Sequence, residues 1–187
     1  MKRTIYFVRH SEPDLNVIDD LTRPLTIEGH HRLKNVVSYF EKIKIDNVFS
    51  SPYKRCIDTV KPIAKSKELE IVTVDDFRER KVSDGWIDDF KTFAMKQWQD
   101  FNYKLKNGES LNDTQKRNVK ALNGVLTQKW ETIVIGTHGT ALSSILNYYF
   151  KDFGYQEFQS IKVEFPFICK VEVENEIVIN YEIIKTN

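Results

Sequence analysis

Two residues suited to phosphate chemistry, Arg9 and His10, follow directly on an apolar run near the start of the 187-residue chain. The run, residues 4–8, is rich in β-branched and aromatic side chains and predicts a buried strand of a parallel sheet. Open α/β sheets bind ligands at the carboxyl ends of such strands. There a guanidinium offers a fork of donors to phosphate oxygens, and a neutral imidazole can attack phosphorus and carry the phosphoryl group. The pair alone is weak evidence, because solvated polar residues commonly end a strand.

Arg55 stands where a helix is expected to begin after a second strand. Residues 47–50 form a short strand-like run, and Ser51-Pro52 is typical of a helix start, with proline at the first helical position. The first turn of a helix favours an anion through its free N–H groups and its dipole, and a guanidinium there adds bidentate donors. The alternative is a surface arginine on an amphipathic helix.

His138 and Glu79 follow two further predicted strands. His138 lies between the apolar run 132–136 and a helix expected over residues 140–150, so a second histidine occupies a second strand end. Glu79 comes shortly after the strand expected over residues 70–74 and is a candidate proton donor. The alternative for Glu79 is a solvated carboxylate in a charged stretch.

Five segments carry short motifs in order along the chain. They are Arg9-His10-Ser11-Glu12, Leu25-Thr26-Ile27-Glu28-Gly29, the Ser-Ser-Pro-x-x-Arg-x-x-x-Thr pattern from Ser50 to Thr59, the Gly-Glu-Ser-x-x-Asp-x-x-x-Arg pattern from Gly108 to Arg117, and His138-Gly139. Together they resemble the motifs of the histidine phosphatase superfamily, which has the phosphoglycerate-mutase-like fold, and the fourth resembles its mutase-like branch. One such motif would be unremarkable, but five in family order are a specific signal.

The resemblance implies roles for the candidate residues. His10 would be the nucleophile that becomes phosphorylated, and Glu79 the general acid and base. Arg9, Arg55 and His138 would form the phosphate pocket, with His138 also a catalytic residue. No metal and no cofactor are implied, because two guanidiniums and a second imidazole can balance the charge of the transferring phosphoryl group.

One further position matches the family, and two others depart from its pattern. Asn16 falls at the spacing where many members carry a phosphate-contacting asparagine, so we expect it to help bind phosphate. Ser11 replaces the usual glycine after the nucleophile, and its hydroxyl can alter the local hydrogen bonds. Gly85 and Trp86 come later than in the Glu-x-x-x-Gly-x-Trp pattern of several phosphatase members. The substrate is therefore left open.

The rest of the sequence predicts the elements that position these residues. Strand-like and helix-like segments alternate before a C-terminal β-hairpin that turns at residues 174–176. Ser110 with Asp113 predicts a helix N-cap, and Pro62 is expected to kink or end the second helix. We predict an α/β fold in one domain over residues 1–187, an α/β/α sandwich with helices on both faces of a mixed, mostly parallel sheet.

A dense group of aromatic residues lies between residues 82 and 103. Trp86, Phe90 and Phe93 can share one helix face, which favours packing against the core. The alternative is a lid over the pocket that favours a substrate with an apolar or aromatic portion.

Charge and composition limit the binding partners and the cellular compartment that we expect for this protein. A formal charge of +1 with both signs mixed along the chain gives no electrostatic signature of nucleic-acid or membrane binding. Cys56 and Cys169 lack metal-ligand spacing and are interpreted as core residues of a protein in a reducing compartment. The sequence shows no run of ~20 apolar residues, so we expect a cytoplasmic protein.

Three classes of function remain. The first is a metal-independent phosphomonoesterase that acts through phosphohistidine on a small phosphorylated metabolite, because every chemical position is filled and the chain is short. The second is a phosphoglycerate-type mutase, which must retain its intermediate in a closed site that usually needs extra segments. The third is a non-catalytic phosphate-binding protein, which would be expected to lack a catalytic residue.

Overall fold

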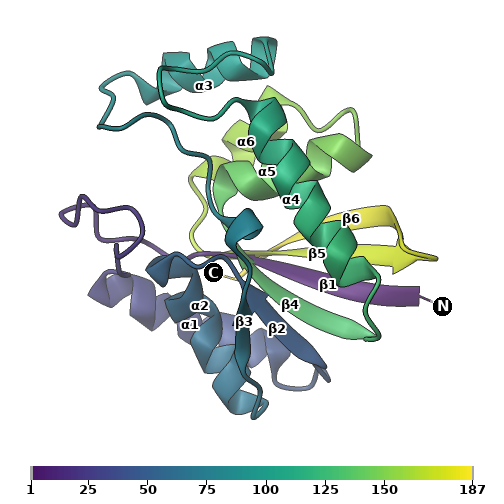
Figure 1. Cartoon of the computed structure of the whole chain (residues 1–187). Coiled ribbons are helices and arrows are strands. Elements are labelled where there is room, and N and C mark those ends of the chain that lie inside the picture. Colours follow the sequence, from purple (N-terminus) through teal and green to yellow (C-terminus); the bar gives the residue numbers. More distant parts are fainter. Residues whose placement is uncertain (1, 187) are drawn as a thin grey trace.

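A six-stranded sheet forms the centre of the molecule in the computed structural model, which describes residues 2–186 (Figure 1). The strands are β1 (Lys2–Arg9), β2 (Asn47–Ser50), β3 (Ile71–Thr73), β4 (Thr132–Thr137), β5 (Phe167–Glu174) and β6 (Ile177–Lys185). Their order is β3-β2-β4-β1-β5-β6. The first four strands run parallel, and β5 pairs antiparallel with both β1 and β6. The predicted mixed, mostly parallel sheet is confirmed.

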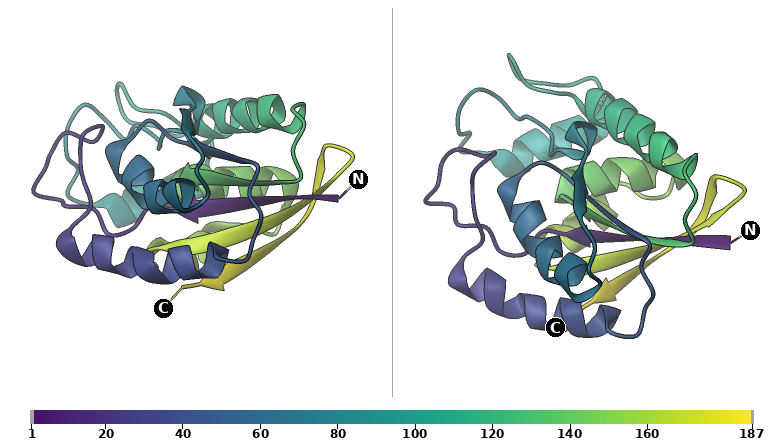
Figure 2. Two further views of the ribbon diagram at one scale, coloured as in Figure 1. Left: turned by 90° about the horizontal axis from the view of Figure 1, so that it is seen from below. Right: turned by 60° about the horizontal axis from the view of Figure 1, so that its bottom comes forward.

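Helices cover both faces of this sheet (Figures 1 and 2). They are α1 (Ile27–Phe40), α2 (Lys54–Ser66), α3 (Phe90–Gln99), α4 (Leu111–Leu126), α5 (Gly139–Tyr149) and α6 (Tyr155–Lys162), with a short 3-10 turn, η1 (Asp75–Phe77), after β3. The pair α1 and α2 lies on one face and α4, α5 and α6 lie on the other, while α3 lies farther out beyond the α5 and α6 side. Within residues 2–186, no helix combines the length and apolar character needed to span a bilayer.

Side chains of β1 point alternately to the two faces of the sheet and contribute to a hydrophobic core on each face. Ile5 and Phe7 pack with residues of α4, α5 and α6, whereas Tyr6 and Val8 point to the opposite face and pack with residues of α1 and α2. All four are buried. A strand that is buried on both faces is expected where helices cover both sides of a parallel sheet. The predicted α/β/α sandwich is therefore confirmed.

Two local predictions have different outcomes. Ser110 caps α4 as predicted, since its hydroxyl accepts from the Asp113 N–H at 3.0 Å and the Asp113 carboxylate accepts from the Ser110 N–H at 3.1 Å. The prediction that Pro62 kinks or ends the second helix is wrong as to the end, because α2 continues to Ser66. Ile63 is fully buried beyond the proline, and packing of this apolar face offsets the lost hydrogen bond.

Candidate active site

His10 and His138 are neighbours because β1 and β4 are adjacent parallel strands. Arg9 pairs with Thr137 at the ends of these strands, and the His10 N–H donates to the Thr137 carbonyl at 3.0 Å. The two imidazole rings then lie with their centroids 5.3 Å apart at an interplanar angle of 65°. Both residues are buried. The structure thus brings the two predicted strand-end histidines into one place.

The hydrogen bonding of His10 determines which ring nitrogen is free. Nδ1 lies 2.7 Å from the carbonyl oxygen of Ser11, and because a carbonyl can only accept, Nδ1 carries the proton. Nε2 therefore holds the lone pair. Burial holds the pKa of His10 well below its ordinary value, and the charges of Arg55 and Arg9 lower it further. A neutral imidazole with a free Nε2 is the form a nucleophile needs.

His138 begins α5 and contacts groups from the β2–α2 junction. Its Nε2 lies 2.7 Å from Ser51 Oγ and 3.3 Å from Cys56 Sγ. Burial lowers the pKa of His138 well below its ordinary value, and the charges of Arg55 and His10 add to the effect. Both cysteines are buried and unbridged, and the interpretation of Cys56 as a core residue missed this contact with a candidate catalytic group.

Arg55 lies in the first turn of α2, as predicted, and its side chain is buried. Its Nη1 donates to the carbonyl oxygen of Asp20 at 2.7 Å and lies 3.0 Å from Asp20 Oδ1. The guanidinium carbon lies 4.9 Å from the centre of the Tyr53 ring, which in turn lies 5.1 Å from the His138 ring, and the charge of Arg55 lowers the pKa of both histidines. An arginine held in this way is a built-in cation for a phosphate group.

Arg9 is anchored by the segment that follows α6. Its Nη1 donates to the carbonyl oxygens of Ile161 at 2.6 Å, Lys162 at 2.8 Å and Glu164 at 2.8 Å. The guanidinium carbon lies 4.0 Å from the centre of the Phe165 ring. Nε is buried and has no hydrogen-bond partner among the described residues.

Gly139 allows the buried Arg9 to approach the start of α5. A Cβ at this position would lie 3.4 Å from the Cζ, Nε and Nη2 atoms of Arg9. Burial lowers the pKa of Arg9 to about 10, so the side chain still carries its charge at neutral pH. The histidine-glycine motif therefore supplies an imidazole and a small residue against which the Arg9 guanidinium packs closely.

Glu79 lies against the N-terminus of α5. Its carboxylate accepts hydrogen bonds from the backbone N–H groups of Thr140 at 3.0 Å, Ala141 at 3.1 Å and Arg80 at 2.8 Å. The positive end of a helix dipole favours a carboxylate at this position. Glu79 also lines the same cavity as Arg9, so the predicted proton donor faces the candidate site.

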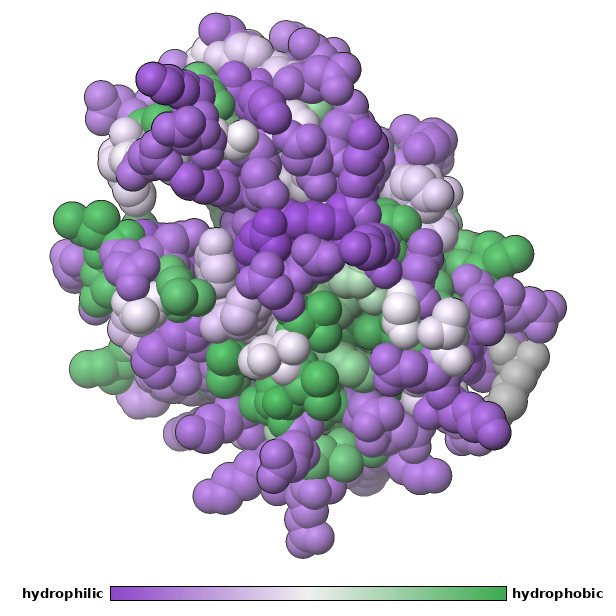
Figure 3. All heavy atoms as spheres, viewed as in Figure 1, coloured by the Kyte–Doolittle hydropathy of each residue, from purple (hydrophilic) through white to green (hydrophobic). Residues whose placement is uncertain are grey.

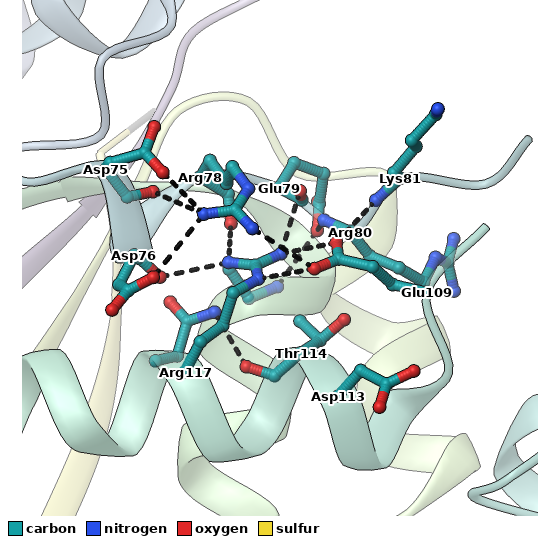
Figure 4. Close-up of polar contacts among 12 residues, drawn as sticks. Asp75, Asp76, Arg78, Glu79, Arg80, Lys81, Glu109, Asp113, Thr114 and Arg117 are labelled. Carbon is teal, nitrogen blue, oxygen red and sulfur yellow. Dashed lines mark hydrogen bonds and ion pairs between the residues drawn. The ribbon is translucent and has the colours of Figure 1, made fainter. Parts of the chain in front are cut away.

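A network around Arg117 holds the chain that carries Glu79 (Figure 4). The Arg117 guanidinium donates to the carbonyl oxygens of Asp76 at 2.9 Å, Arg78 at 2.7 Å and Glu79 at 3.0 Å. The same guanidinium forms a fork with Glu109, with distances of 2.7 and 2.8 Å. The Gly108–Arg117 motif thus contains two residues, Glu109 and Arg117, that hold the segment carrying Glu79, a role that the motif alone did not indicate.

Ser11 and Asn16 show how the loop after β1 is built. Ser11 Oγ donates to the Gly29 carbonyl at 2.8 Å, and its N–H donates to Thr59 Oγ1 at 2.9 Å, so the serine fits in place of the usual glycine. A Cβ on Gly29 would lie only 2.5 Å from the Glu12 carbonyl oxygen, which explains the glycine of the second motif. Asn16 is exposed, and its amide donates to Asp14 at 2.9 Å. The structure does not bring Asn16 together with the other five predicted residues.

A cavity of about 470 Å³ opens beside Arg9 and Glu79. Phe90 from α3 lines it, whereas Phe93 is buried beneath α3 and Trp98 packs against the main core. Packing thus accounts for Phe93 and Trp98. The expectation that Trp86 shares a helix face with Phe90 and Phe93 is wrong, because α3 begins only at Phe90 and Trp86 is 72% exposed.

Comparison with known proteins agrees with the motifs. Residues 5–178 match the model of the histidine phosphatase superfamily, branch 1. An uncharacterised phosphatase of Bacillus subtilis, PhoE, is 26% identical over 146 residues, which are 76% of this chain and 75% of that protein. A probable phosphatase of Schizosaccharomyces pombe is 24% identical over 168 residues, covering 86% of this chain and 79% of that protein.

Solved structures share the fold. A mycobacterial glucosyl-3-phosphoglycerate phosphatase superposes with a TM-score of 0.80 at 15% identity, covering 100% of this chain and 99% of that chain. A phosphoglycerate mutase from Bacillus anthracis superposes with a TM-score of 0.74 at 14% identity, covering 95% and 91%. The family match extends over nearly the whole chain and includes the strand ends where the histidines and arginines meet. The chain belongs to the histidine phosphatase superfamily, branch 1.

Proposed function

We propose that this protein is a metal-independent phosphomonoesterase that forms a phosphohistidine on His10 and acts on a small phosphorylated metabolite. The observation that carries the proposal is the buried, neutral His10, whose Nε2 lone pair is free beside Arg9, Arg55 and His138. Phosphoryl transfer needs positioning and charge stabilisation more than any further covalent chemistry. Two guanidiniums and an imidazole at the nucleophile supply both.

The first chemical step forms the phosphoenzyme. Nε2 of His10 attacks phosphorus while the bond from phosphorus to the ester oxygen breaks. Glu79, which takes up a proton when the phosphate dianion binds beside it, gives that proton to the departing alkoxide, so that an alcohol leaves. Arg9, which lines the cavity, and Arg55 donate to the phosphoryl oxygens together with His138.

The second step returns the enzyme to its starting form. Glu79 now takes a proton from water, the water oxygen attacks phosphorus, and the bond from phosphorus to Nε2 breaks. Inorganic phosphate and neutral His10 result. Arg55 and Arg9 serve both steps, because the same charges that hold phosphate also lower the pKa of His10 and keep its lone pair available at neutral pH.

Trapping of the phosphoenzyme tests the proposal. Wild-type protein mixed with ³²P-labelled aryl phosphate and quenched in base should carry acid-labile label, and His10→Ala should carry none. His31→Ala is the matched control, because the His31 side chain is 65% exposed on α1. Equal labelling of wild type and His10→Ala would exclude His10 as the nucleophile. A chelator should leave turnover unchanged, and a large loss would refute the metal-free assignment.

Phosphoglycerate-type phosphoryl transfer is the second candidate. A 2,3-bisphosphoglycerate-dependent phosphoglycerate mutase of Thermoplasma acidophilum is 35% identical over 71 residues, 35% of this chain and 36% of that protein. Against it, Arg9 and Lys162 are the only cations among the described residues that line the cavity, although a bisphosphoglycerate carries two phosphates and a carboxylate. Stimulation of phosphoglycerate isomerisation by bisphosphoglycerate would favour the mutase. Phosphate binding without turnover of any aryl phosphate would favour a non-catalytic binding protein.

A further inference from the structure

The cavity beside the candidate phosphate pocket has mostly apolar walls. Five of its ten lining residues are large and apolar, and they come from separate parts of the chain. They are Leu15 in the loop after β1, Phe90 at the start of α3, Phe158 in α6, and Val163 and Phe165 in the segment after α6. A volume of about 470 Å³ lies within the range of ~300–1,000 Å³ that is usual for small-molecule sites.

The position of this cavity relates it to the leaving group. Arg9 and Glu79 line it together with Gly139 and Thr140 at the start of α5. In the proposed reaction Arg9 holds the phosphoryl group and Glu79 protonates the departing oxygen. Any group attached to that oxygen must therefore extend from Glu79 into the cavity, so its walls contact the alcohol part of the substrate.

Few side chains in the cavity walls are charged, which is unfavourable for a polar alcohol. Apart from Arg9 and Glu79, Lys162 is the only charged residue among the described lining residues, and its Nζ lies 5.2 Å from the centre of the Phe90 ring. The ammonium group of Lys162 thus lies near an aromatic face of the wall. Sugar hydroxyls placed against the five apolar side chains would lose their hydrogen bonds to water without replacement, which is unfavourable.

Exposed apolar side chains continue outward from the cavity. Leu15 is 60% exposed and Val163 is 74% exposed although both line the cavity, and Ile18 in the same loop as Leu15 is 84% exposed. Figure 3 shows green apolar side chains on the loop that projects at the left, below the region of α3. Exposed apolar groups next to a pocket are typical of a binding surface rather than of a solvated loop.

We propose that the substrate is a phosphomonoester of an apolar alcohol, whose alkyl or aryl body lies along Leu15, Phe90, Phe158, Val163 and Phe165. This inference rests on the proposed phosphatase function. It selects an apolar leaving group over the sugar and glycerate phosphates that would need hydrogen-bond donors and acceptors in the cavity.

A homologous series of alkyl phosphates tests the inference. With ethyl, butyl, hexyl and octyl phosphate below their micelle-forming concentrations, kcat/KM should rise by up to about fourfold per methylene until the cavity is filled. Hexyl phosphate should also exceed glucose 6-phosphate, which has a six-carbon but polar alcohol. Val163→Asp should reduce kcat/KM for octyl phosphate far more than for ethyl phosphate. Val72→Asp is the matched control, because Val72 is an exposed valine on β3, and it should leave the dependence on chain length unchanged.

The outcomes separate this inference from the function on which it rests. Turnover of ethyl phosphate and glucose 6-phosphate with no rise along the alkyl series would overturn the apolar substrate and leave the phosphatase intact. An unchanged chain-length dependence in Val163→Asp would place the alkyl group outside this cavity and overturn the assignment of the site. Absence of turnover for every ester, with no labelling of His10, would overturn the phosphatase and this inference with it.

Discussion

Replacement of Arg117 by methionine should impair catalysis from outside the pocket. The guanidinium donates to the carbonyl oxygens of Asp76, Arg78 and Glu79 and forms a two-bond fork with Glu109. Methionine keeps much of the apolar volume but removes all five hydrogen bonds. The chain that carries Glu79 then loses its support from α4, while the backbone N–H groups of α5 still hold the Glu79 carboxylate.

The magnitudes follow from burial and geometry. The side chains of Arg117 and Glu109 are 9% and 19% exposed, so removing the cation leaves a largely buried carboxylate whose remaining partners are Arg78 at 3.4 Å and the Lys81 N–H at 2.9 Å. Breaking such a pair costs about 3–5 kcal/mol of unfolding free energy. A displacement of Glu79 by ~1 Å would slow the step that it catalyses by about 10²-fold.

Paired substrates and a double variant distinguish positioning from stability. In single-turnover phosphorylation, Arg117→Met should slow an alkyl phosphate far more than nitrophenyl phosphate, because only the poor leaving group needs a proton from Glu79. Chemical denaturation should show that Glu109→Gln combined with Arg117→Met recovers part of the lost stability, since the buried carboxylate that lost its closest cation is removed, but not the alkyl rate. A double variant that recovers the alkyl rate, or an equal loss with both esters, would refute the positioning role.

Four further outcomes are expected. Glu79→Gln should slow alkyl phosphates far more than nitrophenyl phosphate in the first step, by about 10² to 10⁴, and an equal loss for both would remove Glu79 from the acid role. Arg55→Lys should strongly reduce kcat/KM because a point charge cannot replace a fork of donors, and near-normal kinetics would exclude a bidentate contact. Asn16→Ala should change phosphate inhibition little, since its amide bonds Asp14, and a large loss of affinity would show that the loop moves when phosphate binds. Burial depresses the pKa values of His10 and His138, so below the ordinary histidine pKa of ~6.5 the unfolded chain binds more protons than the folded one. The unfolding free energy should therefore decrease by about 1.4 kcal/mol for each histidine and each unit by which the pH is lowered below ~6.5. A dependence of the unfolding free energy on pH that is equal in His10→Gln and the wild type would contradict this.

The residues at the strand ends could be predicted because neighbouring parallel strands end at the same edge of a sheet, so that a strand identified from its own sequence also indicates which residues lie near one another. Apolar runs before His10 and His138 indicate strands that are buried on both faces, and such strands end at one edge of the sheet. The positions of Arg55 and Glu79 followed from the same regularity together with the family motifs. The separation along the sequence does not matter in this case: His10 and His138 are 128 positions apart, and their ring centroids lie 5.3 Å apart.

The anchoring contacts were not predictable in the same way. Arg9 binds carbonyl oxygens more than 150 residues away, and carbonyl groups have no sequence signature. The loop around Asn16 takes its shape from Arg23, which bonds the carbonyl oxygens of Val17 and Ile18, and family spacing does not report such bonds. Spacing identifies a residue type at a position, but the conformation of a loop depends on which side chains meet its backbone.

The anchoring of Arg9 also connects recognition of the phosphoryl group with recognition of the alcohol. The carbonyl oxygens of Ile161, Lys162 and Glu164 occupy Nη1 and leave Nε without a partner among the described residues, while Phe165 covers the guanidinium. The same stretch of chain places Lys162 and Phe165 in the cavity wall. A substitution that shifts this segment must therefore move Arg9, the proposed phosphate ligand, and a wall of the proposed alcohol site together. Substitutions in this segment that change substrate preference are therefore expected to alter kcat as well as KM. Substitutions of Phe90, which belongs to α3, can alter the alcohol site without moving the carbonyl groups that hold Arg9.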